Sequence, residues 1–114
     1  MPDGPELKVN VETRGDAVVV APLGDIAYSE ATPFRAAMRA VMDGRPKRVV
    51  INLGHVDYMN TPGLAVMVEA LQGARKTHAR LILCSINPKV KAILQIAKLN
   101  TVFEIVDTLE LALA

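Results

Sequence analysis

The sequence predicts an α/β fold, a small mixed β-sheet with about four α-helices packed on it in a single domain. Three observations lead to this prediction. The chain has 114 residues, the length of one ordinary domain. Near its start apolar residues recur with the period of two that is typical of strands, and after Gly24 they recur with the helical period. From there predicted strands and helices alternate, which favours parallel strands joined by right-handed crossovers.

The chain is expected to begin with a hairpin. Residues 1–5 contain two prolines and a glycine and are predicted to be a flexible lead-in to a domain over residues 6–114. Residues 7–11 alternate apolar and polar side chains, as in an edge strand with one wet face. Residues 14–16 supply a turn. The continuous apolar run at residues 17–21 is typical of a strand that is covered on both faces.

An amphipathic helix is predicted to follow the hairpin. Ser29 or Thr32 would cap its start, and Pro33 would occupy an early position where the missing N–H costs nothing. Gly44 and Pro46 mark its end. One face carries apolar residues at the spacing i, i+3, i+4 and i+7, namely Phe34, Ala37, Met38 and Val41.

The remaining predicted strands alternate with helices. Residues 48–53 and 80–86 are apolar runs expected to form buried strands, and residues 102–106 a short last strand. Residues 107–110 resemble a capping box, which predicts a final short helix.

Two further helices are each expected to open with a cap residue followed by a proline, at Thr61-Pro62 and at Asn87-Pro88. The first would bury Leu64, Met67, Val68 and Leu71, and the second Val90, Ile93, Leu94 and Ala97.

Composition excludes several classes of function. A net charge of +1 argues against a nucleic-acid binder, which needs a concentrated basic surface. Cys84 is the one cysteine and stands in an apolar run, so we expect a buried small side chain rather than a reactive thiolate. Neither His55 nor His78 has partners at metal-ligand spacing, and the glycines form no phosphate-binding loop. We therefore expect no enzyme activity, no cofactor and no metal site.

The sequence also indicates a location. The first residues lack the basic and apolar regions of a signal peptide, and no apolar run approaches the roughly 20 residues that span a bilayer. We therefore predict a cytoplasmic protein without membrane insertion.

The turn after the third predicted strand carries the remaining signal. Residues 56–65, together with residues 23–26, 84–90 and 97–103, resemble a STAS domain, the family named after sulphate transporters and anti-sigma factor antagonists. The likeness covers nearly the whole chain from about Glu6. It supports the order of strands and helices predicted above.

Antagonists of this family usually place a phosphate-accepting serine after an aspartate at this turn. The resemblance puts Asn60 at the aspartate and Thr61 at the acceptor, while Gly63 matches directly. A hydroxyl at a helix N-terminus would face unpaired N–H groups, where the charge of a phosphate is tolerated. Alternatively, Thr61 simply caps the helix. Asn60 lacks the usual negative charge, and Pro62 stiffens the chain and removes an N–H.

The resemblance implies a non-enzymatic signalling module of bacterial transcription regulation. It would dock an anti-sigma factor of the serine/threonine kinase type and be switched by phosphorylation at Thr61, with a phosphatase as a further partner. Met59 would be either an exposed anchor or a buried staple. The implied partner-binding residues are Gly24, Asp25, Ile26, Ala27, Tyr28, Tyr58, Met59, Asn60, Pro62, Gly63, Ala65 and Glu69.

A second function remains open from the sequence. The pattern from Thr61 to Ala65 also resembles the cytoplasmic STAS subunit of bacterial ABC transport complexes of the phospholipid type. The region from Asn87 to Phe103 is more similar to the antagonists.

Overall fold

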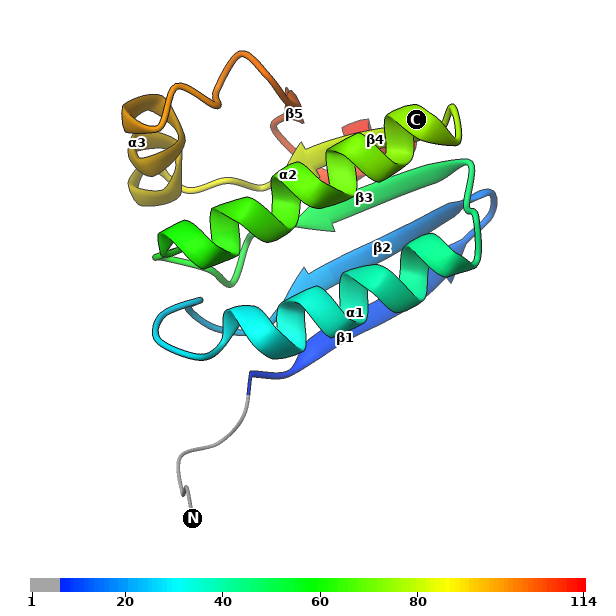
Figure 1. Ribbon diagram of the computed structural model, residues 1–114. Helices are drawn as coiled ribbons and strands as arrows, with labels where there is room; N and C mark the ends of the chain where they lie inside the picture. Colours follow the sequence, from blue (N-terminus) through cyan, green and yellow to red (C-terminus); the bar gives the residue numbers. More distant parts are fainter. Residues whose placement is uncertain (1–6) are drawn as a thin grey trace.

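Five strands form one mixed sheet in the order β1-β2-β3-β4-β5 (Figure 1). The structure is a computed structural model, and it describes residues 7–114. The predicted lead-in at residues 1–5 lies outside the described residues. Along the chain the elements are β1 (Val9–Arg14), β2 (Ala17–Pro22), α1 (Ala31–Asp43), β3 (Arg48–Asn52), α2 (Thr61–Lys76), β4 (Arg80–Cys84), α3 (Pro88–Ile96), β5 (Glu104–Val106) and α4 (Leu109–Leu113).

The pairing of the strands follows the prediction. β1 and β2 are antiparallel, and β2 to β5 are parallel neighbours. The predicted mixed α/β architecture, with an initial hairpin and four helices, is therefore confirmed. Because each parallel strand ends at the same edge of the sheet, the turns that follow β2, β3 and β4 lie near one another, at the left of Figure 1.

The helices cover both faces of the sheet. α1 and α2 lie side by side across one face (Figure 1), and with α3 they enclose the larger apolar cluster, which includes Val20 and Ile51. α4 covers the other face over a smaller cluster, which includes Val19, Val50 and Cys84. Alternate residues of β2 and β3 thus face opposite layers. This explains why these strands are apolar without interruption.

The start of α1 differs from the prediction. The helix begins at Ala31, its N-cap is Glu30, and no side chain caps it, so neither Ser29 nor Thr32 is the cap. The reason is that Glu30 is already helical, with φ −65° and ψ −18°. A capping hydroxyl needs an extended residue before the helix. Here the Glu30 carboxylate instead accepts a hydrogen bond from the Ala27 N–H at 3.2 Å.

The ends of α3 and α4 agree only in part with the predictions. Asn87 caps α3 as predicted, and its side chain accepts a hydrogen bond from the Val90 N–H. Ala97 was expected to be buried, but it is exposed because it follows the last residue of α3. α4 is capped by Thr108, which accepts from the Leu111 N–H at 3.1 Å. The predicted capping box is wrong, because the third helical position is Leu111 and not Glu110.

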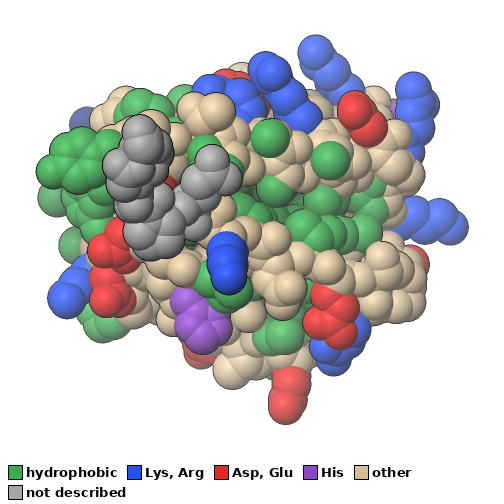
Figure 2. Space-filling model, turned by 90° about the horizontal axis from the view of Figure 1, so that it is seen from below, with side chains coloured by type: hydrophobic (Ala, Val, Ile, Leu, Met, Phe, Trp, Pro, Cys, Tyr) green, Lys and Arg blue, Asp and Glu red, His purple; other side chains and the backbone are tan. Residues whose placement is uncertain are grey.

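β1 is an edge strand as predicted, but its apolar face is only partly covered. Val9 is half-buried, whereas the Val11 side chain keeps 47% of its area exposed. Figure 2 looks onto this side of the molecule, where β1 and α1 lie, and shows hydrophobic side chains gathered along a hollow. An edge strand pairs with one neighbour only, so β1 is less buried than β2.

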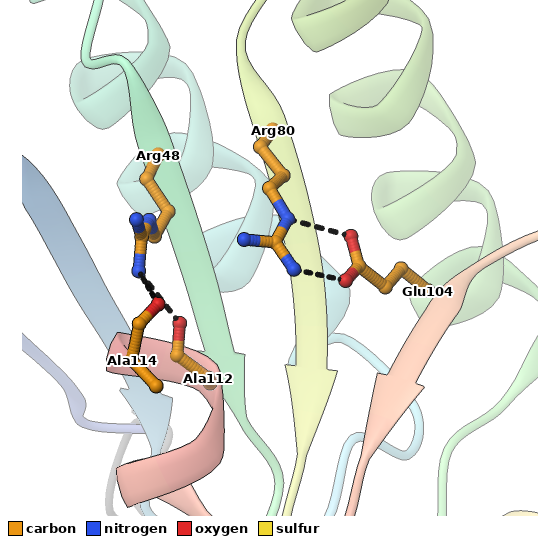
Figure 3. A network of polar contacts seen from close by, with 5 residues as sticks. All are labelled: Arg48, Arg80, Glu104, Ala112 and Ala114. Carbon is orange, nitrogen blue, oxygen red and sulfur yellow. Dashed lines mark hydrogen bonds and ion pairs between the residues drawn. The ribbon is translucent and has the colours of Figure 1, made fainter.

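Arginine side chains fasten the C-terminal segment (Figure 3). Nη1 of Arg48, at the start of β3, donates to the carbonyl oxygens of Ala112 at 3.2 Å and Ala114 at 2.9 Å. Arg80 binds both carboxylate oxygens of Glu104 on β5, one of them at 2.9 Å from Nε. Among the described residues, no helix is long and apolar enough to cross a membrane.

Candidate functional site

Two turns at the carboxyl edge of the sheet are joined by backbone hydrogen bonds. The Ile26 N–H donates to the Tyr58 carbonyl at 2.9 Å, and the Asn60 N–H donates to the Ile26 carbonyl at 2.8 Å. These bonds form an isolated parallel bridge between Ile26 and Met59. The structure therefore brings together the two segments that the sequence assigned to one surface.

Asp25 also contributes to this junction. Its Oδ1 accepts hydrogen bonds from the N–H groups of Asp57 at 2.8 Å and Tyr58 at 3.2 Å. A carboxylate that accepts two backbone N–H bonds fixes the position of a turn. Asp25, one of the predicted partner-binding residues, thus holds the second turn in place.

Asn60, and not Thr61, is the N-cap of α2. Asn60 is extended, with φ −80° and ψ 175°, and its Oδ1 accepts a hydrogen bond from the Gly63 N–H at 2.9 Å. Its Nδ2 donates to the carbonyl oxygen of Tyr28 at 3.2 Å. The alternative that Thr61 caps the helix is therefore wrong, because Asn60 already serves as the cap.

Thr61 is the first residue of α2, and it is exposed. Its hydroxyl makes no hydrogen bond to another described residue, and it is not needed for the helix start. The expectation that this hydroxyl faces unpaired N–H groups does not hold for the residues that follow Thr61. Pro62 has no N–H, the Gly63 N–H is bound by Asn60 Oδ1, and the Leu64 N–H donates to the Asn60 carbonyl at 3.0 Å.

Gly63 lies directly over the bridge between the two turns. A Cβ at this position would come within 2.6 Å of Met59 Cγ and 2.7 Å of Ile26 Cγ2, so only glycine fits. Met59 is 1% exposed and Ile26 is fully buried. Of the two possibilities for Met59, the structure thus supports the buried one. Ile26, Met59 and Gly63 are all buried, so they lie beneath the predicted surface and not on it.

The exposed part of the predicted surface surrounds Thr61. Tyr28 is 92% exposed and Tyr58 47% exposed. Pro62, Ala65 and Glu69 are exposed on α2, whereas Gly24 and Ala27 are half-buried.

Glu69 is held across the groove between the two long helices. Its carboxylate oxygens accept hydrogen bonds from Arg35 Nε at 3.2 Å and Nη2 at 2.9 Å. This ion pair between α1 and α2 lowers the pKa of Glu69, mainly through the side-chain hydrogen bond. Glu69, one of the predicted partner-binding residues, is therefore held by an ion pair with α1.

The turn before α3 is tied to the same edge. Asn87 Nδ2 donates to the Val56 carbonyl at 2.8 Å and to Asp57 Oδ1 at 2.6 Å. Three turns are thus connected through Asp25, Asp57 and Asn87.

A groove beside Thr61 includes residues that were not predicted to belong to the site. It has a volume of about 410 Å³, lies between the start of α2 and α3, and includes Leu64, Ile93 and Ile96. Ile96 is 84% exposed. The signal was present in the sequence, since Ile96 falls outside the apolar stripe of α3.

Few groups of the described residues could take part in chemistry beside the Thr61 hydroxyl. Within residues 7–114, no group of three or more His, Cys, Asp or Glu side chains could hold a metal ion. Cys84 is buried, and burial raises the pKa of its thiol. No hydrogen bond joins the Thr61 hydroxyl to an acid or base within residues 7–114.

Comparisons with known proteins agree with this geometry. The model of the STAS domain family matches residues 8–112. BtrV of Bordetella bronchiseptica, whose name describes it as an anti-sigma factor antagonist, is 29% identical over 100 residues, covering 87% of this chain and 86% of BtrV.

Solved structures share the fold. An anti-sigma factor antagonist from Mycobacterium paratuberculosis has a TM-score of 0.86 at 23% identity, covering 95% of this chain and 92% of that chain. Bacillus SpoIIAA in its phosphorylated form has a TM-score of 0.73 at 18% identity, covering 93% and 96%. The predicted fold and the resemblance to the family are thus confirmed.

Proposed function

Because the chain belongs to the STAS domain family, we propose that it is an anti-sigma factor antagonist that docks an anti-sigma factor of the serine-kinase type. Thr61 accepts a phosphoryl group from that partner, and the phosphate switches docking off. The observation that carries this proposal is the exposed Thr61 hydroxyl, which the Asn60 cap leaves free. The protein acts in the cytoplasm, has no enzyme activity of its own, and a phosphatase restores it.

Two relatives support this proposal. BtrV, the relative that is similar over most of its length, is named as an anti-sigma factor antagonist. SpoIIAA has been solved in both an unphosphorylated and a phosphorylated form, so a protein of this fold carries the modification.

The proposed transfer forms one bond and breaks one. Thr61 Oγ1 attacks the γ-phosphorus of ATP held by the kinase, the bond from that phosphorus to the bridging oxygen breaks, and ADP leaves. The hydroxyl proton passes to a base on the kinase, since no hydrogen bond joins Thr61 to a described acid or base of this chain. The added group carries about −1.5 to −2 charges at pH 7.

The surroundings of Thr61 explain how this charge would act. The docking surface at this edge includes the exposed rings of Tyr28 and Tyr58 and the apolar groove beside α3. Beyond Thr61 itself, the N–H groups of the first turn of α2 are already bound or absent. A phosphate would therefore stay at the surface, where its charge and bulk oppose an apolar partner contact.

Calorimetry with purified anti-sigma factors of the source organism tests the proposal. We expect a one-to-one complex with one kinase-type factor. Thr61→Glu should weaken that complex at least about tenfold, or 1.4 kcal/mol, whereas Thr61→Ser should bind like the parent. Thr13→Glu is the matched control, because Thr13 is exposed on β1 at the opposite end of the sheet.

Two results would contradict the proposal. Equal binding by the parent and by Thr61→Glu, at equal foldedness, would exclude the switch at Thr61. Failure to bind any anti-sigma factor, with co-purification of a transport ATPase, would favour the transporter subunit instead.

A further inference from the structure

We infer that Asn60 is a positioning residue that holds Tyr28 outward as the aromatic anchor of the docking surface, and that this role requires an amide at position 60. The inference rests on the proposed function, because it concerns the same surface. It adds a specific connection between the phospho-acceptor turn and the turn that carries Tyr28. That connection is a single side chain.

Tyr28 is the most exposed aromatic residue of the described chain. Its side chain is 92% exposed, whereas Phe34 is fully buried and Phe103 is 5% exposed. Its backbone has φ 47°, in the left-handed region that is unfavourable for a bulky residue. Exposed aromatic rings on rigid backbone are typical anchors of protein interfaces. Neighbouring residues must stabilise this conformation, because a positive φ and an exposed ring are both unfavourable for Tyr28 by itself.

The turn is held on both sides of Tyr28. Ile26 is fixed by its backbone bonds to Tyr58 and Asn60. The Ala27 N–H is bound by the Glu30 carboxylate at 3.2 Å, and the Glu30 N–H donates to the Ala27 carbonyl at 3.0 Å. Tyr28 itself is held through its carbonyl oxygen, which accepts from Asn60 Nδ2 at 3.2 Å. The ring is thus presented in an ordered turn, so a partner does not have to order this segment on binding.

An amide is needed because Asn60 accepts and donates at once. Its Oδ1 caps the Gly63 N–H and its Nδ2 binds the Tyr28 carbonyl. A carboxylate has only acceptor oxygens. Aspartate at position 60 could therefore still cap α2. It would, however, place a carboxylate oxygen beside the Tyr28 carbonyl oxygen, where no hydrogen bond can form. Asn60 thereby links the orientation of Tyr28 to the start of α2, which carries Thr61.

Two substitutions separate the two bonds of Asn60. Asn60→Asp and Asn60→Ser both keep an acceptor for the Gly63 N–H. Aspartate has no donor, and the single hydroxyl of serine is shorter than the amide arm, so neither side chain should reproduce the bond from Nδ2 to the Tyr28 carbonyl. The first readout is amide hydrogen exchange of the free protein, followed by NMR at Ala27, Glu30 and Gly63. We expect exchange at Ala27 and Glu30 to accelerate at least about fivefold in both variants, with little change at Gly63.

The second readout is affinity for the kinase-type anti-sigma factor that the parent protein binds. Tyr28→Ala should weaken binding at least about tenfold, and Asn60→Asp and Asn60→Ser should weaken it about fivefold or more. In the Tyr28→Ala background, Asn60→Ser should cost almost nothing further, because both changes remove the same contact. The control is Leu111→Ala, whose side chain is 55% exposed on α4, on the other face of the sheet.

The outcomes are distinguishable. Unchanged exchange at Ala27 and Glu30 overturns the positioning role of Asn60, whether or not a partner binds. Faster exchange with full affinity, or full affinity of Tyr28→Ala, overturns the anchor role of Tyr28. If the parent binds no anti-sigma factor, the proposed function fails and the docking role fails with it, while the exchange result still decides the positioning role.

Discussion

α2 and α3 begin with the same kind of N-cap, but the residues that follow the two caps differ. Each follows a strand at the carboxyl edge of the sheet, and each is capped by an extended asparagine. Asn60 Oδ1 accepts from the Gly63 N–H and Asn87 Oδ1 from the Val90 N–H, both at 2.9 Å. In both cases Nδ2 donates to the carbonyl of a neighbouring turn, that of Tyr28 or of Val56.

The two starts differ in what stands behind the cap. α3 continues with Pro88 and buries Val90 at its third position. α2 inserts Thr61 between the cap and the proline, and it has Gly63 at its third position because Ile26 and Met59 fill the space below. At the start of α3, Asn87 joins the helix to a neighbouring turn, and no hydroxyl follows the cap. The start of α2 exposes the Thr61 hydroxyl, which makes no hydrogen bond within the described fold and is available for a partner.

The largest effect is expected from filling the space under α2. Gly63→Ala should lower the free energy of unfolding by about 2 kcal/mol, because the new Cβ would clash with the buried Met59 and Ile26 side chains. Gly73→Ala is the matched control in the same helix. Its Cβ would meet only Met42 Cε at 3.5 Å, so it should stabilise the protein by about 0.5–1 kcal/mol. Urea denaturation measures both, and equal effects would contradict the tight contact at Gly63.

Removing the two caps comes next. Asn60→Ala should cost about 1 kcal/mol of unfolding free energy, the usual value of an N-cap. Asn87→Ala should cost about 2 kcal/mol, because it also leaves the carbonyl of the buried Val56 without its 2.8 Å partner. The Tyr28 carbonyl, which Asn60 binds, belongs to an exposed residue, so losing that bond costs less. Thermal denaturation with matched baselines gives both values. A harmless Asn60→Ala would contradict the assignment of the cap to Asn60.

Acid is expected to weaken the ion pair between Arg80 and Glu104. The two asparagine caps should stay intact, because amides do not titrate. The hydrogen bond from Arg80 lowers the pKa of Glu104. The pair therefore adds stability above the ordinary glutamate pKa of about 4.3, and this is lost as the pH falls through the lowered pKa. Since Glu104 is largely exposed, the loss should stay below about 1 kcal/mol. The free energy of unfolding, measured at pH 7 and at pH 3, should differ less between the two pH values in Glu104→Gln than in the parent.

The smallest effect is expected at Thr61 itself. Thr61→Ala should change the free energy of unfolding by less than about 0.5 kcal/mol, as for an exposed side chain without partners. The same urea denaturation compares it with Asn60→Ala. A loss as large as that of Asn60→Ala would mean that Thr61 caps the helix after all.

Periodicity and turn residues predicted the fold well, because strands and helices bury one face or two. The continuous apolar run from Ala17 onwards identified a strand covered on both sides, which α1 and α4 now explain. The helix starts were harder to predict, since several residues can cap. Thr61 and Asn60 are both good caps, and only the extended backbone at Asn60 decides between them.

The site was predicted from a resemblance, whereas its internal contacts were not predictable. Nothing local in the sequence signals that Asp25 binds the N–H groups of Asp57 and Tyr58, because the contact joins segments 32 and 33 residues apart. The same holds for Asn60 and Tyr28. The burial of Met59 depends on the bridge to Ile26, which forms only once the sheet is assembled.

Phosphate mapping tests the central claim most directly, that the fold leaves Thr61 free for a partner kinase. The protein is incubated with its kinase-type anti-sigma factor and ATP, and the modified residue is located by mass spectrometry. We predict phosphate on Thr61 alone and none on the Thr61→Ala variant. Phosphate on Ser29 or Ser85 while Thr61 stays unmodified would contradict the account.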